Sequence, residues 1–403
     1  AHTCVAFVFK RKGEFMPQAG KTCITFCIPN MIIGGVETVF ETTIDALAKN
    51  PDIDIRIITH ARVREPLHKQ WLKSHPEIPV YVCYPLQNWF QDLVQHCRFF
   101  PLRQIRKIAF SLYKKYRRVI LRHRHIFDNT DVIIDYKNFE FFKELRHVKR
   151  PKIAWAHSAM SYFESIGAFS RLPIYDVIVG ITDDFVTDFK HQFPQYANNI
   201  VRIYNPIDIA AIRARAACAD TPDDKYFCHV SRLVDGKDIK TLLRAFDAFA
   251  ADADDTKLYI VGDGNRADDF KKYASKLKSC DRIVFTGALS NPYGIMRGAI
   301  ANILSSEFEG FGMVLVESLA LDVPCISSKC KNGPREILMD GAAGFLFAVG
   351  DATELTTAMS TIANKHCDID TLHKNMAASL VRFDPRMVAI DIADLVGRMM
   401  TTN

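Results

Sequence analysis

The sequence predicts an α/β protein made of two doubly wound domains, each with a parallel sheet. Three observations support this fold class. A chain of 403 residues is too long for one ordinary core and fits two domains of roughly 200 residues each. Short β-branched, apolar runs alternate with helical patterns in both halves, as expected for buried parallel strands joined by helices. Between the halves, Asn205-Pro206-Ile207-Asp208 interrupts regular structure, because proline restricts the residue before it.

The first domain is predicted to span residues 22–206. Its first strand runs from Cys23 to Ile28 and leads through a glycine turn into a helix that begins near Glu37. Further short apolar runs predict strands at residues 53–58, 132–134, 153–155 and 177–179. Residues 1–21 precede the first predicted strand and are set apart as an extension outside the core fold. Residues 1–15 lack the long apolar core and the cleavage site of a signal peptide, so this extension is not expected to be one.

The second domain is predicted to span residues 207–384. A strand at residues 226–230 is followed by a polar turn and by helical periodicity from Ile239 to Ala250. Further strands are expected at residues 257–261, 282–285, 301–304 and 324–326. Residues 385–403 form a last helix, from about Pro385 to Met400.

Two glutamates eight residues apart, Glu309 and Glu317, flank a glycine-rich turn and the start of a predicted helix. Gly310 and Gly312 allow the backbone to run close to a ligand, and amides at a helix start face an anion such as a diphosphate. Ionised carboxylates only accept hydrogen bonds, so Glu309 suits the hydroxyls of a sugar and Glu317 a vicinal diol such as a ribose. The segment therefore indicates a sugar-nucleotide site.

Two cations upstream support this interpretation. Arg232 and Lys237 lie in the turn between the predicted strand at 226–230 and the following helix. A guanidinium gives a forked contact and an ammonium gives a compact charge, so together they form an anion clamp.

In combination these segments resemble the family 4 glycosyltransferases, which are retaining enzymes of the GT-B fold. The resemblance covers most of the chain, and it depends on the order and separation of its motifs. These are Gly34-Gly35-Val36-Glu37, Trp155-Ala156-His157, Asn205-Pro206-Ile207-Asp208, Ser231-Arg232-Leu233 with Lys237, Val261-Gly262-Asp263-Gly264, Phe285-Thr286-Gly287 and the 309–317 segment.

The resemblance implies transfer of a hexose, with retention, from a nucleoside diphosphate sugar to a hydroxyl of a glycan or lipid-linked acceptor in bacterial surface polysaccharide or lipopolysaccharide synthesis. A UDP-sugar is the expected donor. By carry-over Glu309, His157, Arg232 and Lys237 are the expected catalytic residues, with His157 near the anomeric carbon. The expected donor-binding residues are Gly34, Gly35, Arg232, Lys237, Gly262, Glu309, Phe311, Gly312, Met313, Val314 and Glu317. The last helix is expected to cross back onto the first domain.

Alternatives from other classes remain open. A GT-B sugar-nucleotide epimerase would use a similar site without an acceptor, and a non-catalytic GT-B scaffold would keep the fold alone. The Gly262-x-Gly264 pattern after a strand resembles a dinucleotide-binding fingerprint, but the acidic residue expected about twenty positions on is represented only by Asp281, which precedes the next strand. The donor hexose, its base and the acceptor are not readable from the sequence.

Neither a cofactor nor an essential metal is expected. Asp-x-Asp triplets at 52–54, 252–254 and 368–370 are expected in loops or at helix edges, and the two cations supply the charge that a metal ion would otherwise give the leaving diphosphate. The eleven cysteines are scattered without a Cys-x-x-Cys pair, which indicates neither zinc nor a disulfide framework and favours a reducing cytoplasm.

Positive charge concentrates in one stretch, from Arg98 to His125. It holds ten Lys and Arg, no Asp or Glu, and interleaved apolar residues. A basic amphipathic helix of this kind favours an anionic membrane surface, although an ordinary helix with a solvated basic face stays open. No nucleic-acid module accompanies it, so nucleic acid is not an expected partner. The protein is therefore expected at the inner face of the cell membrane, as a peripheral protein.

Overall fold

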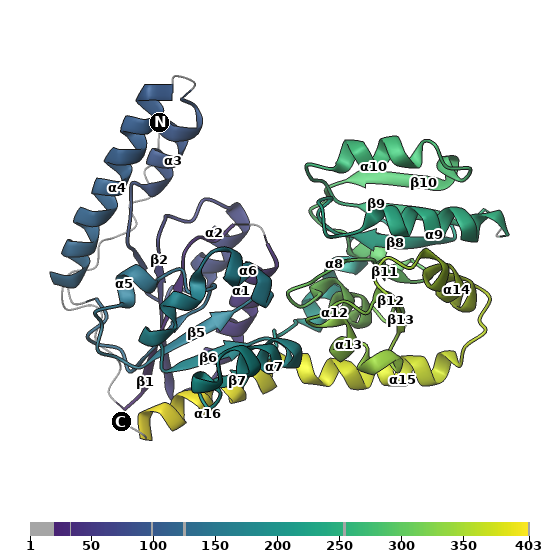
Figure 1. Ribbon diagram of the computed structural model, residues 1–403. Coiled ribbons are helices and arrows are strands. Elements are labelled where there is room, and N and C mark those ends of the chain that lie inside the picture. Colours follow the sequence, from purple (N-terminus) through teal and green to yellow (C-terminus); the bar gives the residue numbers. More distant parts are fainter. Residues whose placement is uncertain (1–19, 33, 98–99, 124–125, 253–254, 402–403) are drawn as a thin grey trace. The chain divides into compact units, whose positions relative to one another are not determined.

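The computed structural model describes residues 20–401 except 33, 98–99, 124–125 and 253–254. These residues form two compact units, which are described separately. Unit 1 comprises residues 20–156, 164–179 and 389–401 of the described chain, and unit 2 comprises residues 157–163 and 180–388. Figure 1 shows the elements along the chain.

The first half of the chain forms a seven-stranded sheet in the order β3-β2-β1-β4-β5-β6-β7. The pairs β1–β2, β1–β4, β2–β3 and β4–β5 are parallel, and Phe26 on β1 lies opposite Ile57 on β2 and Ile134 on β4. The strands are β1 (Thr22–Ile28), β2 (Ile53–Thr59), β3 (Val80–Val82), β4 (Val132–Asp135), β5 (Lys152–Ala156), β6 (Val177–Gly180) and β7 (Ile200–Arg202).

The central strands are buried almost throughout, which explains their continuous apolar runs. Aromatic rings fill the space between the sheet and the first helix: the ring centroids of Phe40 and Tyr136 lie 5.2 Å apart, and those of Tyr136 and Trp155 lie 5.0 Å apart. The helices of this half are α1 (Gly35–Leu47), α2 (Pro66–Ser74), α3 (Gln87–Gln95), α4 (Phe100–His123), α5 (Phe142–Leu145), α6 (Met160–Ser165) and α7 (Asp183–Gln192), with 3-10 turns η1 (Ala168–Ile174) and η2 (Pro194–Tyr196).

The second half forms a six-stranded parallel sheet in the order β10-β9-β8-β11-β12-β13. Its core joins Phe227 on β8, Ile260 on β9 and Ile303 on β11 to Phe246 on the helix that follows β8. The strands are β8 (Tyr226–Val230), β9 (Lys257–Val261), β10 (Ile283–Gly287), β11 (Asn302–Leu304), β12 (Cys325–Ser328) and β13 (Phe345–Phe347).

Helices alternate with these strands, as in a doubly wound fold. They are α8 (Ile209–Ala217), α9 (Ile239–Ala251), α10 (Ala267–Ala274), α11 (Tyr293–Arg297), α12 (Met313–Ala320), α13 (Pro334–Ile337), α14 (Ala352–Ala363), α15 (Ile369–Leu380) and α16 (Pro385–Thr401), with 3-10 turns η3 (Cys280–Arg282), η4 (Met339–Gly341) and η5 (Val381–Phe383). The part of α16 from Ala389 onward clusters with unit 1.

The predicted fold class is confirmed, and each predicted strand is present within a few residues. Three strands were not predicted: β3, β7 and β13 have three residues each, too few to show a period. One triplet differs from its expected setting, since Asp54 lies inside β2 rather than in a loop. The predicted boundary at residues 206 and 207 stays a prediction: the two sheets lie on either side of it, whereas compactness groups residues 180–388 together.

No helix among the described residues is both long and apolar enough to cross a bilayer. The cysteines in the described chain carry free thiols, and most of them are buried. Burial raises the pKa of the Cys23 thiol to about 11 and that of the Cys325 thiol to about 12.

Candidate active site

The candidate site residues of unit 2 lie where its parallel strands end. The loops after β8, β9, β10 and β11 leave the same edge of the sheet, because the strands run in the same direction and are neighbours. In open α/β sheets this edge is where ligands bind. Arg232 and Lys237 follow β8, Gly262 follows β9 and Glu309 follows β11.

Lys237 and Glu309 form a partly buried ion pair. The Lys237 Nζ lies 2.5 Å from Glu309 Oε1, and the side chains are 19% and 11% exposed. The Ser306 hydroxyl donates to the same Glu309 oxygen at 2.6 Å. The pair joins two loops that are 72 residues apart in sequence, and the second carboxylate oxygen of Glu309 has no hydrogen-bond partner among the described residues.

Backbone contacts fix the two loops against each other. The Ser305 hydroxyl donates to the carbonyl of Lys237 at 2.9 Å, and the Glu307 amide donates to the carbonyl of Gly236 at 2.9 Å. Asp238 caps α9 by accepting the Thr241 amide at 3.3 Å. The backbone around Lys237 is therefore fixed by hydrogen bonds at residues 236, 237 and 238.

Arg232 lies beside a small apolar slot. A cavity of about 190 Å³ is lined by Arg232, Gly262, Leu289 and Pro292 among others. The Arg232 side chain is exposed and has no hydrogen bond or ion pair to another described residue. Gly262 adopts φ +140°, and a Cβ there would lie 1.8 Å from the carbonyl oxygen of Ser231, so only glycine lets these two loops meet.

The buried side chain of His229 links the loop after β8 to β11. His229 bonds to the carbonyl oxygen of Ile303 at 2.8 Å through Nδ1 and to the Ser231 hydroxyl at 2.7 Å through Nε2. Since a carbonyl only accepts, Nδ1 carries the proton and Nε2 accepts from Ser231. Burial lowers the pKa of His229 to about 4; the bond to Ile303 opposes this shift, and the charge of Lys237 adds to it. The ring is therefore neutral at pH 7.

The start of α12 has the geometry expected for anion binding. Gly312 precedes the helix with φ +92°, and the amides of Met313 and Val314 in the first turn have no intrahelical acceptor. Phe311 precedes Gly312 in the same turn, but its ring is buried and packs against Phe383, with ring centroids 5.6 Å apart. Any ligand contact of Phe311 is therefore limited to its backbone.

Glu317 lies one turn into α12, where it accepts a hydrogen bond from the Tyr293 hydroxyl at 3.3 Å. The guanidinium of Arg215 lies over the Tyr293 ring, 4.6 Å from its centroid. Burial raises the pKa of Glu317, while the Tyr293 hydroxyl and the charge of Arg215 oppose the shift. Glu317 is thus held by Tyr293 of α11, which packs against Arg215 of α8. It shares no contact with the Lys237 and Glu309 pair among the contacts described above.

His157 belongs to unit 2 and lies beside the 309–312 turn. A Cβ on Gly310 would lie 2.7 Å from the carbonyl oxygen of His157, so the turn approaches this backbone closely. His157 itself is buried, with 7% of its surface exposed. Gly34 and Gly35 belong to unit 1, where they are exposed at the start of α1.

Several residues of this site were not singled out in the sequence. Ser306 contacts Glu309 and Tyr293 contacts Glu317, whereas His229 contacts Ser231, the neighbour of Arg232. Ser306 follows a strand at the same sheet edge as Arg232, which is a signal that the sequence contained. His229 and Tyr293 carried no such signal, because each lies within an element that reads as core.

Comparisons with known proteins agree with the fold. The family model described as "Glycosyl transferases group 1" matches residues 213–377. The lipopolysaccharide 1,6-galactosyltransferase of Salmonella typhimurium is 34% identical over 159 residues, which are 38% of this chain and 43% of that protein. This chain spans about half the length of the curated relatives it matches.

Solved structures share the architecture of nearly the whole chain. The apo form of the lipopolysaccharide outer core galactosyltransferase WaaB aligns with a TM-score of 0.67 at 20% identity, over 94% of this chain and 99% of that one. Anabaena HepE in complex with UDP and glucose aligns with a TM-score of 0.69 at 18% identity, over 94% and 100%. The GT-B fold expected from the sequence is therefore confirmed, and residues 213–377 of this chain are similar to the glycosyl transferases group 1.

Proposed function

We propose that this protein is a retaining glycosyltransferase that moves a hexose from a nucleoside diphosphate sugar to a hydroxyl of a surface glycan or lipid-linked acceptor. The observation that carries the proposal is the joining of Lys237, Glu309 and Ser306 beside the start of α12. A cation, a carboxylate and free helix amides in one place suit a diphosphate and the sugar attached to it. Relatives named as lipopolysaccharide galactosyltransferases support transfer over isomerisation or a silent scaffold.

A uridine nucleotide is the proposed donor. The structures of HepE, a protein of the same fold, hold UDP, UDP with glucose, or UDP-glucose. The apolar slot of about 190 Å³ beside Arg232 and Gly262 suits one flat base, with Glu317 left to accept from a ribose. Gly34 and Gly35, together with His157, stay proposed donor contacts.

The proposed chemistry depends on stabilising the leaving diphosphate. Departure of the hexose leaves negative charge on a phosphate oxygen, which Arg232, Lys237 and the amides of Met313 and Val314 are suited to neutralise. Glu309 orients the hexose by accepting from its hydroxyls. The acceptor attacks from the face that the diphosphate leaves, and its proton passes to the departing phosphate oxygen, so that retention needs no separate base. No resident metal or cofactor is part of this proposal.

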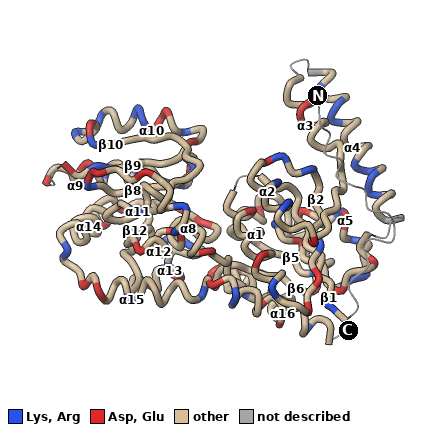
Figure 2. The backbone as a smooth tube through the Cα atoms, turned by 180° about the vertical axis from the view of Figure 1, so that it is seen from behind, with Lys and Arg blue, Asp and Glu red and all other residues tan. Residues whose placement is uncertain are grey.

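A membrane-surface location is proposed from α4. Residues Ile105, Ile108, Leu112, Tyr116 and Val119 recur at spacings of three and four, and each is at least 51% exposed. They form one continuous apolar stripe on a 24-residue helix. Figure 2 shows Lys and Arg along the same helix and no acidic residue on it.

The other side of α4 packs on the protein, which separates its cations into two groups. Arg106 donates to the carbonyl of Leu93 at 2.7 Å, and Arg117 donates to the carbonyl of Cys83 at 2.9 Å. Arg103 and Lys115 are exposed instead. An apolar stripe beside exposed cations is complementary to an anionic bilayer surface. The ends of the predicted stretch, residues 98–99 and 124–125, lie outside the described residues.

The donor proposal is tested by thermal shift with a panel of nucleoside diphosphates and their sugars, followed by product analysis. A ligand at 100 times its Kd stabilises a protein by roughly 2.7 kcal/mol, so UDP should raise Tm while ADP and GDP should not. Release of UDP from one UDP-hexose, with the sugar found on an acceptor or on water, would support transfer. An isomerised nucleotide sugar, or no response to any nucleotide, would contradict it.

Vesicle flotation tests the membrane proposal. Binding to phosphatidylglycerol vesicles should exceed binding to phosphatidylcholine vesicles and fall with salt, since exposed charges are screened over about 10 Å at 0.1 M. The variant Arg103→Glu/Lys115→Glu should lose binding. Lys271→Glu/Lys272→Glu, which changes two exposed lysines of α10, is the matched control. Equal binding by parent and α4 variant would leave α4 as an ordinary solvated helix.

A further inference from the structure

Two side chains fix α12 against the neighbouring helices of unit 2. Arg213 of α8 donates to the carbonyl of Ala320, the last residue of α12, at 2.8 Å. Asn302 of β11 donates to the carbonyl of Met296 at 3.3 Å and to the hydroxyl of Ser318 at 2.7 Å, so it joins α11 to α12. A side chain of α11 can therefore meet a side chain of α12 at a defined place.

Tyr293, the first residue of α11, makes such a contact with Glu317 of α12. The tyrosine is buried, and its hydroxyl donates to Oε1 of Glu317 at 3.3 Å. Burial and the charge of Glu317 raise the pKa of Tyr293, so the phenol keeps its proton and remains a donor. The other carboxylate oxygen of Glu317 has no hydrogen-bond partner among the described residues, yet it is not closed off from solvent. Glu317 thus presents one free acceptor.

Arg215 of α8 supports the Tyr293 ring. Its guanidinium lies 4.6 Å from the ring centroid and donates to the carbonyl of Ser290 at 2.9 Å. The Asn291 side chain donates to the carbonyl of Arg215 at 2.8 Å, so the loop before Tyr293 is bound to α8 at two places. Burial raises the pKa of Glu317, and Tyr293 and Arg215 oppose that shift. Both therefore favour the ionised carboxylate, which accepts hydrogen bonds.

The loop before α11 also lines the apolar slot proposed for the base. Leu289 and Pro292 line this slot of about 190 Å³, and Pro292 directly precedes Tyr293. In a nucleotide the base is attached directly to the ribose, so a carboxylate that binds the ribose must lie close to the base. The loop that shapes the slot thus also places the partner of Glu317.

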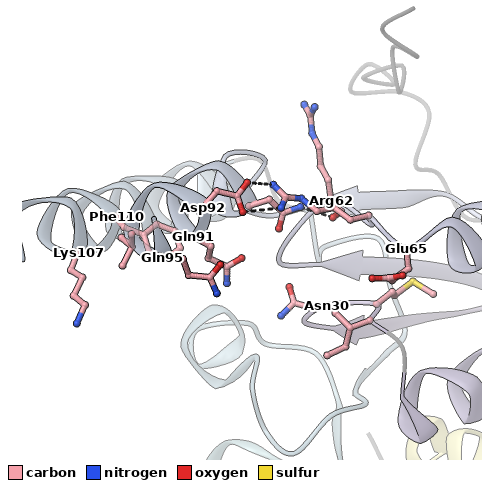
Figure 3. Close-up of a pocket in the computed structure, with 13 residues that line it drawn as sticks. Asn30, Arg62, Glu65, Gln91, Asp92, Gln95, Lys107 and Phe110 are labelled. Carbon is pink, nitrogen blue, oxygen red and sulfur yellow. Dashed lines mark hydrogen bonds and ion pairs between the residues drawn. The ribbon is translucent and has the colours of Figure 1, made fainter. Parts of the chain in front are cut away.

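The cavity of about 420 Å³ in unit 1 is built differently. Figure 3 shows a forked ion pair between Arg64 and Asp92 in its lining, with N–O distances of 3.0 and 2.7 Å, so these two charges are already matched. Other polar side chains of the lining are exposed to solvent: Arg62, Gln91, Gln95 and Lys107. A solvated lining indicates no particular ligand, whereas Glu317 is half-buried and bound by a buried tyrosine.

We propose that Tyr293, supported by Arg215, is a positioning residue for ribose recognition: it holds one oxygen of Glu317 so that the other accepts from the 2′ and 3′ hydroxyls of the donor nucleotide. The inference rests on the proposed transferase function, because the ribose is that of its nucleoside diphosphate sugar. A carboxylate that rotates freely loses that freedom when it binds a ligand, and a phenol that has already fixed it reduces the cost. Tyr293 therefore acts on the ribose through Glu317.

Two ligands that differ only in the diol test this role. Calorimetry measures the Kd of UDP and of its analogue whose ribose lacks the 2′ and 3′ hydroxyls. The parent should bind UDP about tenfold or more tightly than the analogue, because the analogue makes no hydrogen bond to the charged Glu317. Tyr293→Phe should weaken UDP binding by about fivefold and change binding of the analogue by less than about twofold, since only UDP uses Glu317.

Tyr259→Phe is the matched control. Tyr259 also donates to a carboxylate, that of Asp224, but Asp224 precedes β8 and so lies at the edge of the sheet opposite to the site. This variant should bind both ligands like the parent.

A double variant tests whether Tyr293 acts through the carboxylate. Tyr293→Phe/Glu317→Gln should bind UDP no more weakly than Glu317→Gln alone, because the hydroxyl has then lost the group it positions. With a UDP-sugar as donor, Tyr293→Phe should raise KM by a larger factor than it lowers kcat, since the ribose contact is the same in the ground state and the transition state.

An equal loss for UDP and the analogue in Tyr293→Phe would show a general structural role and overturn the proposal, as would additive losses in the double variant. If Tyr293→Phe does not fold, Arg215→Gln decides, because it changes an exposed side chain and keeps the phenol. A loss of about twofold or more that is limited to UDP would then support the proposal, and no loss or an equal loss for both ligands would overturn it.

The same measurements separate this inference from the proposed function. If the parent binds UDP, and Glu317→Gln removes its preference over the analogue while Tyr293→Phe keeps it, only the role of Tyr293 is overturned. If the parent binds no nucleoside diphosphate, the proposed function fails and this inference fails with it.

Discussion

The two cations after β8 differ in their surroundings, and this difference predicts different outcomes on substitution. Arg232 is exposed and unpaired in the described chain, whereas Lys237 is paired with Glu309, whose side chain is 11% exposed. Arg232→Ala and Lys237→Ala should therefore both impair transfer. Only Lys237→Ala should also destabilise unit 2.

The magnitudes follow from burial. Leaving one member of a buried ion pair without its partner costs about 3–5 kcal/mol. Both side chains keep some contact with water and Glu309 keeps Ser306, so we expect a loss of about 2 kcal/mol for Lys237→Ala. For Arg232→Ala we expect a change within about 0.5 kcal/mol, as for other surface positions. Each variant should lower kcat by roughly 10²–10³, the usual effect of one lost donor to a developing negative charge.

Urea unfolding and UDP release from a UDP-sugar measure the two effects separately. Adding Glu309→Gln to Lys237→Ala removes the uncompensated carboxylate, so the double variant should recover about 1 kcal/mol of stability and no activity. Full activity in Arg232→Ala would refute the anion clamp. Equal stability of Lys237→Ala and the parent would refute the energetic argument from the Lys237 and Glu309 pair.

Three further predictions concern pH, metal and backbone. The pKa of His229 is about 4 in the folded protein and about 6.5 in the unfolded chain, so the unfolded chain binds a proton first as the pH falls. The free energy of unfolding should therefore be highest above pH 6.5 and fall by up to about 3 kcal/mol as the pH drops toward 4. In urea titrations from about pH 4 to 8, His229→Gln should show a smaller pH dependence than the parent. Treatment with EDTA should leave transfer intact, and an absolute requirement for manganese or magnesium would refute the metal-free clamp. Gly262→Ala should lower Tm strongly and weaken UDP binding, since its Cβ would meet the Ser231 carbonyl; unchanged melting would show that the two loops separate easily.

The sequence predicted the fold because its signals are local. Runs such as 226–230 and 257–261 have enough residues to show burial, and both correspond to strands with the same bounds. The site was predictable in part for the same reason: Lys237 and Glu309 each follow a strand, and parallel strands end at one edge. That the two side chains pair directly was not predictable, because it depends on β8 and β11 being neighbours.

Other features of the site arise from packing that no local pattern shows. Glu317 was expected to be free for a diol, and its hydrogen bond to Tyr293 depends on α11 and α12 both packing against α8. Phe311 was expected to contact the donor through its backbone amide, and the packing of its ring against Phe383 in the core could not be read from the sequence. The basic stretch at residues 98–125 predicted a helix, yet only the packing of α4 on α3 tells which cations face away from the protein.

Because most of the cysteines are buried, their reaction with thiol reagents measures local opening of the native protein. A thiol reacts with alkylating reagents as the thiolate, so buried thiols with raised pKa values, such as Cys23 in unit 1 and Cys325 in unit 2, stay unlabelled until their surroundings open. Within the described chain only Cys218 and Cys280 are exposed, and both belong to unit 2. Timed labelling followed by mass spectrometry would thus report the opening of each unit separately, without any engineered residue.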